Sequence, residues 1–165
     1  MRLMCDEMLG GLARWLRAAG HDTALAQAGE PDHALIERCR SEERVLVSRD
    51  GDLVREARDS VTALLLGGGD MDQHAATLTQ ALGLDWTYAP FTRCMIDNTP
   101  LHPAEPEAVA CIPPRARSLP GPFLMCPTCS RVFWPGSHVR RMQQRLQRWA
   151  SLATEPARAP PPSPC

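Results

Sequence analysis

Four short apolar runs recur along the first half of the chain, each bounded by polar or turn residues. The runs cover residues 2–5, 22–25, 45–47 and 61–66. Runs of this length without a helical period are typical of strands buried in a parallel sheet. The pattern therefore predicts four strands in the first sixty-six residues.

Apolar residues at helical spacing fill the intervals between these runs. In the first interval Leu9, Leu12, Leu16 and Ala19 share one face, and Gly20 is a helix stop. A second helix begins at Asp32, a short third helix covers 52–57, and a capping-box pattern at 70–73 opens a fourth helix that runs through Leu82. Strands that alternate with helices predict a parallel, three-layer α/β domain.

The periodic pattern stops near Ala89-Pro90. Residues 91–136 hold many prolines, four cysteines and few periodic stretches. A segment of this kind needs a cross-link or a bound metal in order to fold. Ser137 then begins a last helix, whose apolar face carries Val139, Met142, Leu146 and Trp149. We therefore expect an α/β domain over 1–88, a small module with a terminal helix over 89–150, and a disordered Pro-rich tail over 151–165.

Composition describes a globular chain with an uneven charge. The 165 residues are 44% hydrophobic, and no apolar run approaches membrane-spanning length or forms a signal peptide, so we expect a cytoplasmic protein with no membrane partner. Residues 1–90 carry nine arginines against fifteen acidic residues, whereas residues 91–165 carry nine against four. An acidic first half suits a metal site, and a basic second half suits a polyanion.

Aspartates follow two of the predicted strands. Asp6 ends the first strand and Asp50 follows the third, and the carboxyl ends of parallel strands open onto the ligand crevice. Asp32, which begins the helix before the third strand, and Asp52 can reach the same crevice. Clustered carboxylates attract a hard cation such as Mg²⁺ or Mn²⁺, which can activate water. Alternatively, these aspartates are only helix caps or turn residues.

A second possible metal site lies in the proline-rich segment. Cys126 and Cys129 form a C-x-x-C pair, and Cys94 and Asp97 have the same spacing. Zinc accepts carboxylate oxygen as well as thiolate, so three cysteines and one aspartate can hold it. His102 and Cys111 are reserve ligands, and a redox role for the C-x-x-C pair is the rival interpretation.

Basic and aromatic side chains in the second half could contact a nucleic acid. Arg141, Arg145 and Arg148 form a stripe on the last helix that could follow a phosphate backbone, although solvated helix faces often look the same. Further candidates for phosphate contacts are Arg14, Arg93 and His138. The aromatic residues Phe123, Phe133 and Trp134 could stack on bases or form the small core of the module.

Five segments together resemble the mut-seven C-terminal ribonuclease domain family. They are the run Cys5–Arg17, Ser48-Arg49-Asp50, Thr92-Arg93-Cys94, Cys126-Pro127-Thr128-Cys129, and Val132–His138. The resemblance covers roughly residues 1–150. It implies a Rossmann-like, PIN-like nuclease domain followed by a zinc ribbon. It places Asp6, Asp32 and Asp50 at the acidic positions and Cys94, Cys126 and Cys129 at three zinc positions; the family usually has cysteine where this chain has Asp97.

These expectations combine into a metal-dependent ribonuclease. Asp6 and Asp50 would hold Mg²⁺ or Mn²⁺ directly. Asp32, with help from Asp52, would ligate or orient the attacking water, and the ribbon and last helix would hold the RNA backbone. Two alternatives remain open. The chain could be a non-catalytic nucleic-acid-binding module, or a toxin-like PIN domain inhibited by a protein partner.

Overall fold

A parallel sheet of four strands forms the centre of the molecule in the computed structural model, which describes residues 1–152. The strands are β1 (Arg2–Cys5), β2 (Asp22–Leu25), β3 (Val45–Ser48) and β4 (Ala63–Leu65), in the order β2-β1-β3-β4. All four predicted strands are present. The last is shorter than its apolar run at both ends, since residues 61, 62 and 66 lie outside the strand, although Leu66 is buried.

Helices connect the strands as predicted. A 3₁₀ turn, η1 (Glu7–Leu9), leads into α1 (Gly10–Ala18), and it is followed by α2 (Asp32–Ser41), α3 (Gly51–Ala57) and α4 (Met71–Leu82). The capping box before α4 is confirmed, because the Asp70 carboxylate accepts from the Gln73 N–H and the Gln73 side chain accepts from the Asp70 N–H. Gly20 follows α1 with a φ of 94°, a conformation that ends a helix and favours glycine.

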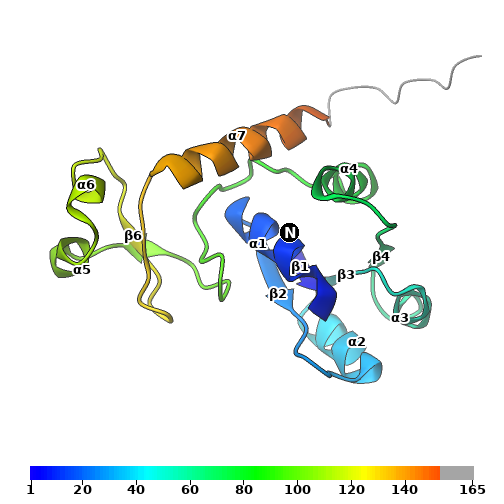
Figure 1. Ribbon diagram of the computed structural model, residues 1–165. Coiled ribbons are helices and arrows are strands. Elements are labelled where there is room, and N and C mark those ends of the chain that lie inside the picture. Colours follow the sequence, from blue (N-terminus) through cyan, green and yellow to red (C-terminus); the bar gives the residue numbers. More distant parts are fainter. Residues whose placement is uncertain (153–165) are drawn as a thin grey trace, which may run out of the picture.

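Alternate side chains of β1 enter two different cores, which makes the fold three-layered. Leu3 and Cys5 pack with residues of α1 and α4, whereas Met4 packs with residues of α2 and α3. Burial on both faces explains why this strand has no alternation of apolar and polar residues. The predicted α/β class, a parallel sheet flanked by helices, is confirmed (Figure 1).

The segment after residue 89 forms a small module with its own sheet. Strands β5 (His102–Pro103), β6 (Leu124–Met125) and β7 (Val132–Phe133) are antiparallel in the order β5-β6-β7, and two short helices, α5 (Pro106–Ala110) and α6 (Pro114–Arg117), lie between β5 and β6. Figure 1 shows this module at the opposite end of the molecule from α3 and α4. We call it the ribbon.

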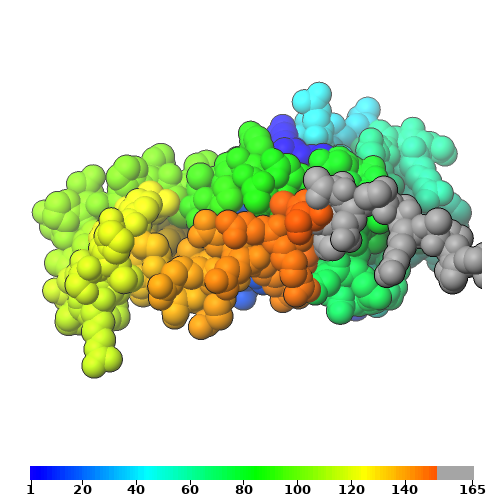
Figure 2. All heavy atoms as spheres, turned by 90° about the horizontal axis from the view of Figure 1, so that it is seen from above, coloured from blue at the N-terminus to red at the C-terminus, as the bar shows by residue number. Residues whose placement is uncertain are grey.

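The last helix, α7 (Ser137–Leu152), joins the two parts of the molecule. It leaves the ribbon and runs to α4, and Figure 2 shows it along one face of an elongated molecule. Leu146 and Trp149 are buried in the same core as Leu3, and the Trp149 ring lies 4.9 Å from that of Trp15 and 4.7 Å from that of Trp86. The terminal helix is therefore also part of the α/β core.

The predicted tail over 151–165 lies outside the described residues except for 151 and 152, which belong to α7 and not to the tail. Among residues 1–152, no helix has the length and apolar character needed to cross a membrane.

Candidate active site and metal centre

Asp6 and Asp50 come together at the carboxyl edge of the sheet. Asp6 directly follows β1, and its backbone N–H donates to the Val47 carbonyl of β3 at 3.0 Å. The strands β1 and β3 are neighbours, and the chain passes from β1 to β2 in one direction and on to β3 in the other. The two aspartates therefore flank the point at which the strand order reverses, where open α/β sheets bind ligands.

Ser48 connects the two aspartates. Its hydroxyl group, which is fully buried, donates to Asp6 Oδ2 at 2.7 Å and accepts from the Asp50 N–H at 2.9 Å. A short bridge thus runs from the Asp6 carboxylate through Ser48 to the Asp50 backbone. The sequence analysis names Ser48 only as part of the Ser48-Arg49-Asp50 motif and gives it no role; that motif and its place at the end of β3 are the signals that point to it.

Both aspartates are also helix caps, as the alternative interpretation expected. Asp6 Oδ1 accepts from the Glu7 N–H at 2.6 Å and begins η1. Asp50 Oδ1 accepts from the Asp52 and Leu53 N–H groups at 2.8 and 3.2 Å and begins α3. Both of these bonds to Asp50 go to Oδ1, so the capping role does not use Oδ2.

The other two candidate carboxylates are more peripheral. Asp32 is the exposed first residue of α2, and Asp52 is an exposed residue whose Oδ1 lies 2.7 Å from Nη2 of Arg55. Within residues 1–152, the one group of three or more potential metal ligands lies in the ribbon, so neither aspartate forms such a group with Asp6 and Asp50. Glu7, which was not predicted, reaches toward the loop before α2 and accepts from the Gly29 N–H at 3.3 Å.

The ribbon brings together the four predicted zinc ligands. The ligand atoms of Cys94, Asp97, Cys126 and Cys129 all lie within 4.8 Å of one another. Cys94 Sγ is 3.7 Å from Cys129 Sγ, and Cys126 Sγ is 3.3 Å from Asp97 Oδ2. The reserve ligands His102 and Cys111 are exposed and lie outside this group. The four groups could hold a metal such as zinc, which supports the metal interpretation of the C-x-x-C pair.

Two loops of the same construction present these ligands. In the first loop the Cys94 N–H donates to the Thr99 carbonyl and the Asn98 N–H to the Cys94 carbonyl; in the second the Cys126 N–H donates to the Arg131 carbonyl and the Ser130 N–H to the Cys126 carbonyl. Asn98 and Ser130 have φ values of 73° and 57°. Asp97 therefore occupies the position in its loop that Cys129 occupies in the other.

The surroundings of this metal centre affect the charge of its ligands. Partial burial opposes ionisation of Asp97, but hydrogen bonds from the Thr99 backbone and side chain and from the thiols of Cys129 and Cys126 lower the pKa of its carboxyl group well below the usual range. Burial raises the pKa of the Cys94 thiol to about 12, so a bound cation is needed to keep it as thiolate. The set then offers four anionic ligands.

Arg17 of α1 fastens the first of these loops to the α/β domain. Its guanidinium group donates through Nη1 to the Met95 and Ile96 carbonyls at 3.3 and 2.7 Å and through Nε to the Thr23 carbonyl at 2.8 Å. Burial lowers the pKa of Arg17, while Cys5, Cys94 and Asp97 raise it. This buried cation partly balances the anionic ligand set.

Some of the candidate nucleic-acid-binding residues are exposed, and others already contact groups within the protein. Arg14, His138 and Arg141 are exposed. Arg93 is half-buried and donates to the Asn98 carbonyl at 2.9 Å, so it stabilises the first metal loop. Arg145 lies over the rings of Trp15 and Trp149 and belongs to a different arrangement, described next.

Asp72 of α4 holds α7 in place. Its Oδ1 accepts from Nη2 of Arg145 at 2.8 Å and from Nε1 of Trp149 at 2.9 Å, and its Oδ2 accepts from Arg148. Hydrogen bonds from Arg145 and then Trp149 lower the pKa of the Asp72 carboxyl group. Two of the three arginines in the predicted stripe thus have a carboxylate partner within the fold.

Fold and site together describe a Rossmann-like α/β domain with carboxylates at its switch point and a candidate metal-binding ribbon. A family model, the Mut7-C RNAse domain, matches residues 1–146, and the chain belongs to this family. Membership confirms the predicted resemblance and indicates a nuclease-type function with RNA as the substrate. No curated protein and no solved structure gives a significant match to the chain.

Proposed function

We propose that this protein is a divalent-metal-dependent ribonuclease that hydrolyses phosphodiester bonds at the Asp6–Asp50 edge of the sheet. The observation that carries the proposal is the Asp6–Ser48–Asp50 bridge at the topological switch point. Two carboxylates held by neighbouring strands offer the oxygen ligands that Mg²⁺ and Mn²⁺ prefer. Family membership supplies independent support for RNA cleavage.

Each residue of the site has a role that follows from its position. Asp6 and Asp50 would hold the metal, which supplies an activated water and stabilises charge on the phosphate. Ser48 and the Glu7 N–H fix the Asp6 carboxylate in one orientation. Asp32 and Asp52 stand at the starts of α2 and α3 with exposed carboxylates, of which Asp52 pairs through Oδ1 with Arg55, and they would orient water or accept a proton.

The ribbon and α7 would bind the RNA backbone. Zinc held by Cys94, Asp97, Cys126 and Cys129 would fix the two loops of the ribbon. Arg14, Arg141 and His138 are exposed and can contact phosphates. Arg93 and Arg145 would also contact phosphates, while they keep their hydrogen bonds to the Asn98 carbonyl and to Asp72.

A second candidate function is non-catalytic RNA binding. It is favoured by one observation: the capping bonds of Asp6 and Asp50 give each carboxylate a structural role without any metal. The two functions make opposite predictions for a substitution that keeps the cap and removes the charge.

Asp50→Asn is that substitution. Asparagine caps helices as well as aspartate, so the stability of α3 should change little, whereas loss of a metal ligand should slow RNA cleavage on the order of 100-fold or more. The measurement is cleavage of labelled single-stranded RNA with Mn²⁺. Asp70→Asn, which changes the equivalent cap of α4, is the matched control and should remain active. Full activity of Asp50→Asn would reject the proposal.

The ribbon site can be tested by metal analysis. We expect one zinc per chain, its loss in Cys126→Ser, and its retention in Asp97→Cys, which completes a four-cysteine set. Metal-free protein should be markedly less stable, because the free energy of zinc binding to the folded ribbon contributes to its folding free energy. The exposed Cys111→Ser variant is the control. Equal zinc in Cys126→Ser and wild type would show that these ligands do not form the site.

A further inference from the structure

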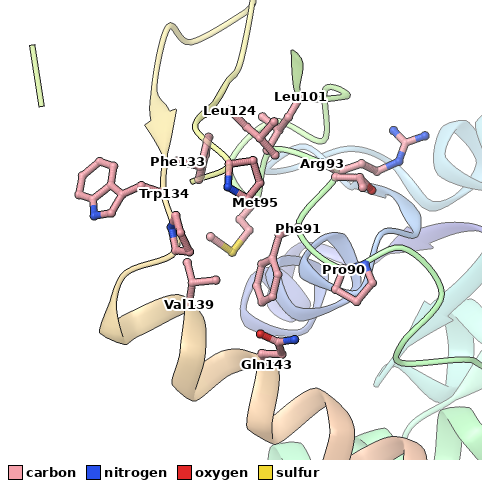
Figure 3. Close-up of a pocket in the computed structure, with 13 residues that line it drawn as sticks. Pro90, Phe91, Arg93, Met95, Leu101, Leu124, Phe133, Trp134, Val139 and Gln143 are labelled. Carbon is pink, nitrogen blue, oxygen red and sulfur yellow. The ribbon is translucent and has the colours of Figure 1, made fainter. Parts of the chain in front are cut away.

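An apolar pocket of about 350 Å³ lies where the ribbon meets α7. It is open to solvent on one side and is lined by the chain after residue 89, by β6 and β7, and by the first turns of α7 (Figure 3). Its walls are mainly aromatic and aliphatic, and include Phe91, Met95, Leu101, Leu124, Phe133 and Val139. In Figure 3 the Met95 side chain reaches between Phe91 and Val139, and Gln143 lies beside Phe91.

This volume and lining suit one flat, apolar ring system with polar edges. Small-molecule sites range from about 300 to 1,000 Å³ and combine apolar walls with a few polar groups, so this pocket is at the small end of the range. Aromatic walls stack on nucleobases. The Gln143 amide can both donate to and accept from a base edge.

We propose that this pocket binds a single unstacked base of the RNA strand, a subsite separate from the carboxylates. The proposal rests on the proposed function, since it takes RNA as the substrate. The pocket would give the protein affinity for bases in addition to phosphates.

The pocket and the proposed active site lie near opposite ends of α1, so one RNA strand could run along this helix and reach both. The Phe91 N–H donates to the Ala18 carbonyl at the end of α1, whereas Asp6 precedes its beginning. Nine helical residues span about 14 Å, a few nucleotides of extended RNA. Exposed Arg14 lies between these ends, close enough to Arg17 to lower its pKa, and Arg17 in turn holds the Met95 backbone.

The charge beside the pocket also favours a nucleic acid over an apolar peptide. On α7, Val139 and Gln143 line the pocket, and exposed Arg140 is next to the first and three residues before the second. His138 and Arg141 are exposed on the same turns. A base in the pocket would therefore place its phosphates beside cationic side chains.

The test compares two ligands that differ only in their bases. Binding of a labelled twelve-nucleotide single-stranded RNA and of an abasic chain of the same length is measured by fluorescence anisotropy, with full-length protein and no added divalent metal. Val139→Trp, which fills the pocket, should weaken binding of the RNA roughly 10-fold and leave the abasic chain within about twofold. Gln147→Trp introduces the same side chain two turns along α7 at an exposed position outside the pocket, and should bind like wild type.

Unchanged RNA binding by Val139→Trp would overturn the proposal, and the pocket would then be a binding site for an apolar protein segment. An equal loss for both ligands would overturn it as well, because it would indicate a general disturbance. If Val139→Trp does not fold, the proposal is tested by NMR titration of the wild-type protein. Uridine 5′-monophosphate should shift the methyl signals of Met95 and Val139, and ribose 5-phosphate should not. No shift with the nucleotide would overturn the base subsite.

Cleavage assays on the same wild-type preparation separate this proposal from the ribonuclease proposal. Protein that cleaves RNA but binds both ligands equally would reject the base subsite alone. Protein that binds bases in the pocket but never cleaves would reject the ribonuclease alone.

Discussion

Ser48 shows how one buried hydroxyl group can organise two charged residues. It has no exposed surface, and it uses its donor on the Asp6 carboxylate and an acceptor lone pair on the Asp50 N–H. Alanine at this position would leave the Asp50 N–H without its partner and free the Asp6 side chain to rotate. The pair of aspartates would then be present but poorly oriented.

Ser48→Ala should therefore affect both stability and cleavage. Loss of two hydrogen bonds in a partly buried setting should lower the free energy of unfolding by about 1–3 kcal/mol, measured by urea denaturation. Cleavage should fall while RNA binding is retained, since Ser48 acts through Asp6. Ser41→Ala removes an exposed hydroxyl that donates to the Arg38 carbonyl, and should change stability by less than about 0.5 kcal/mol. Equal effects of the two variants would contradict this role.

The sequence predicts which side chains carry chemistry better than it predicts their partners. Asp6, Asp50 and the four ribbon ligands are recognisable because each follows a strand or has a fixed spacing. Ser48 and Arg17 lie in the motifs shared with the family, but the pattern predicts no role for them, because a serine at the end of a strand and an arginine off the apolar face of a helix are ordinary. Their importance depends on neighbours far along the chain, such as the Met95 carbonyl that Arg17 binds.

The amphipathic pattern predicts the helices but not what lies on the polar side of α7. Its apolar residues Met142, Leu146 and Trp149 are buried as expected. The neighbouring stripe of arginines was interpreted as an RNA-binding face or a solvated face. Arg145 and Arg148 of this stripe also pair with Asp72. Asp72 is in the first turn of α4, so the periodicity of α7 cannot predict this contact.

Asp72→Asn should loosen the contact between α4 and α7. At neutral pH the substitution keeps the acceptor for Trp149 and removes the charge that pairs with both arginines, so we expect a loss of about 1 kcal/mol in urea denaturation. The Asp72 pKa is lower in the folded protein, so its contribution is fully present above the unfolded value, about 3.9, and is lost as the pH falls through the folded value.

The difference between wild type and Asp72→Asn should therefore be constant from pH 7 to 5 and shrink below about pH 4. Asp59→Asn, at an exposed position, is the control and should follow wild type at each pH. A difference that grows in acid would contradict the assigned ion pairs.

At the scale of the whole molecule, the first metal loop covers the outer edge of the sheet. Asn98 accepts from the Thr23 N–H of β2 at 2.9 Å and donates to Asp22 Oδ1 at 2.7 Å. β2 is an edge strand, so the first of these bonds occupies a ladder group that would otherwise face solvent. The spacing of Cys94 and Asp97 predicts the loop but carries no information about this docking.

Asn98→Gly separates this docking from the shape of the loop. Glycine tolerates the φ of 73°, so the loop should persist while both cross-module bonds are lost. We expect faster amide exchange at Thr23 and a stability loss of about 1–2 kcal/mol. Ser130→Gly alters the equivalent position of the other loop and should leave Thr23 exchange unchanged. Unaltered exchange in Asn98→Gly would show that the edge is protected by other contacts.

The burial of Trp149 between Trp15 and Trp86 also determines when the α/β domain can finish folding during synthesis. The first strand made, β1, is central in the sheet, yet the layer above it is completed by a side chain near the end of the described chain. While the ribbon is being synthesised, the apolar surface of α1 and α4 stays exposed, because α7, which carries Trp149, has not yet been made. A ribosome stalled within the ribbon would thus display a nearly complete α/β layer with an open apolar face, the kind of surface that chaperones bind.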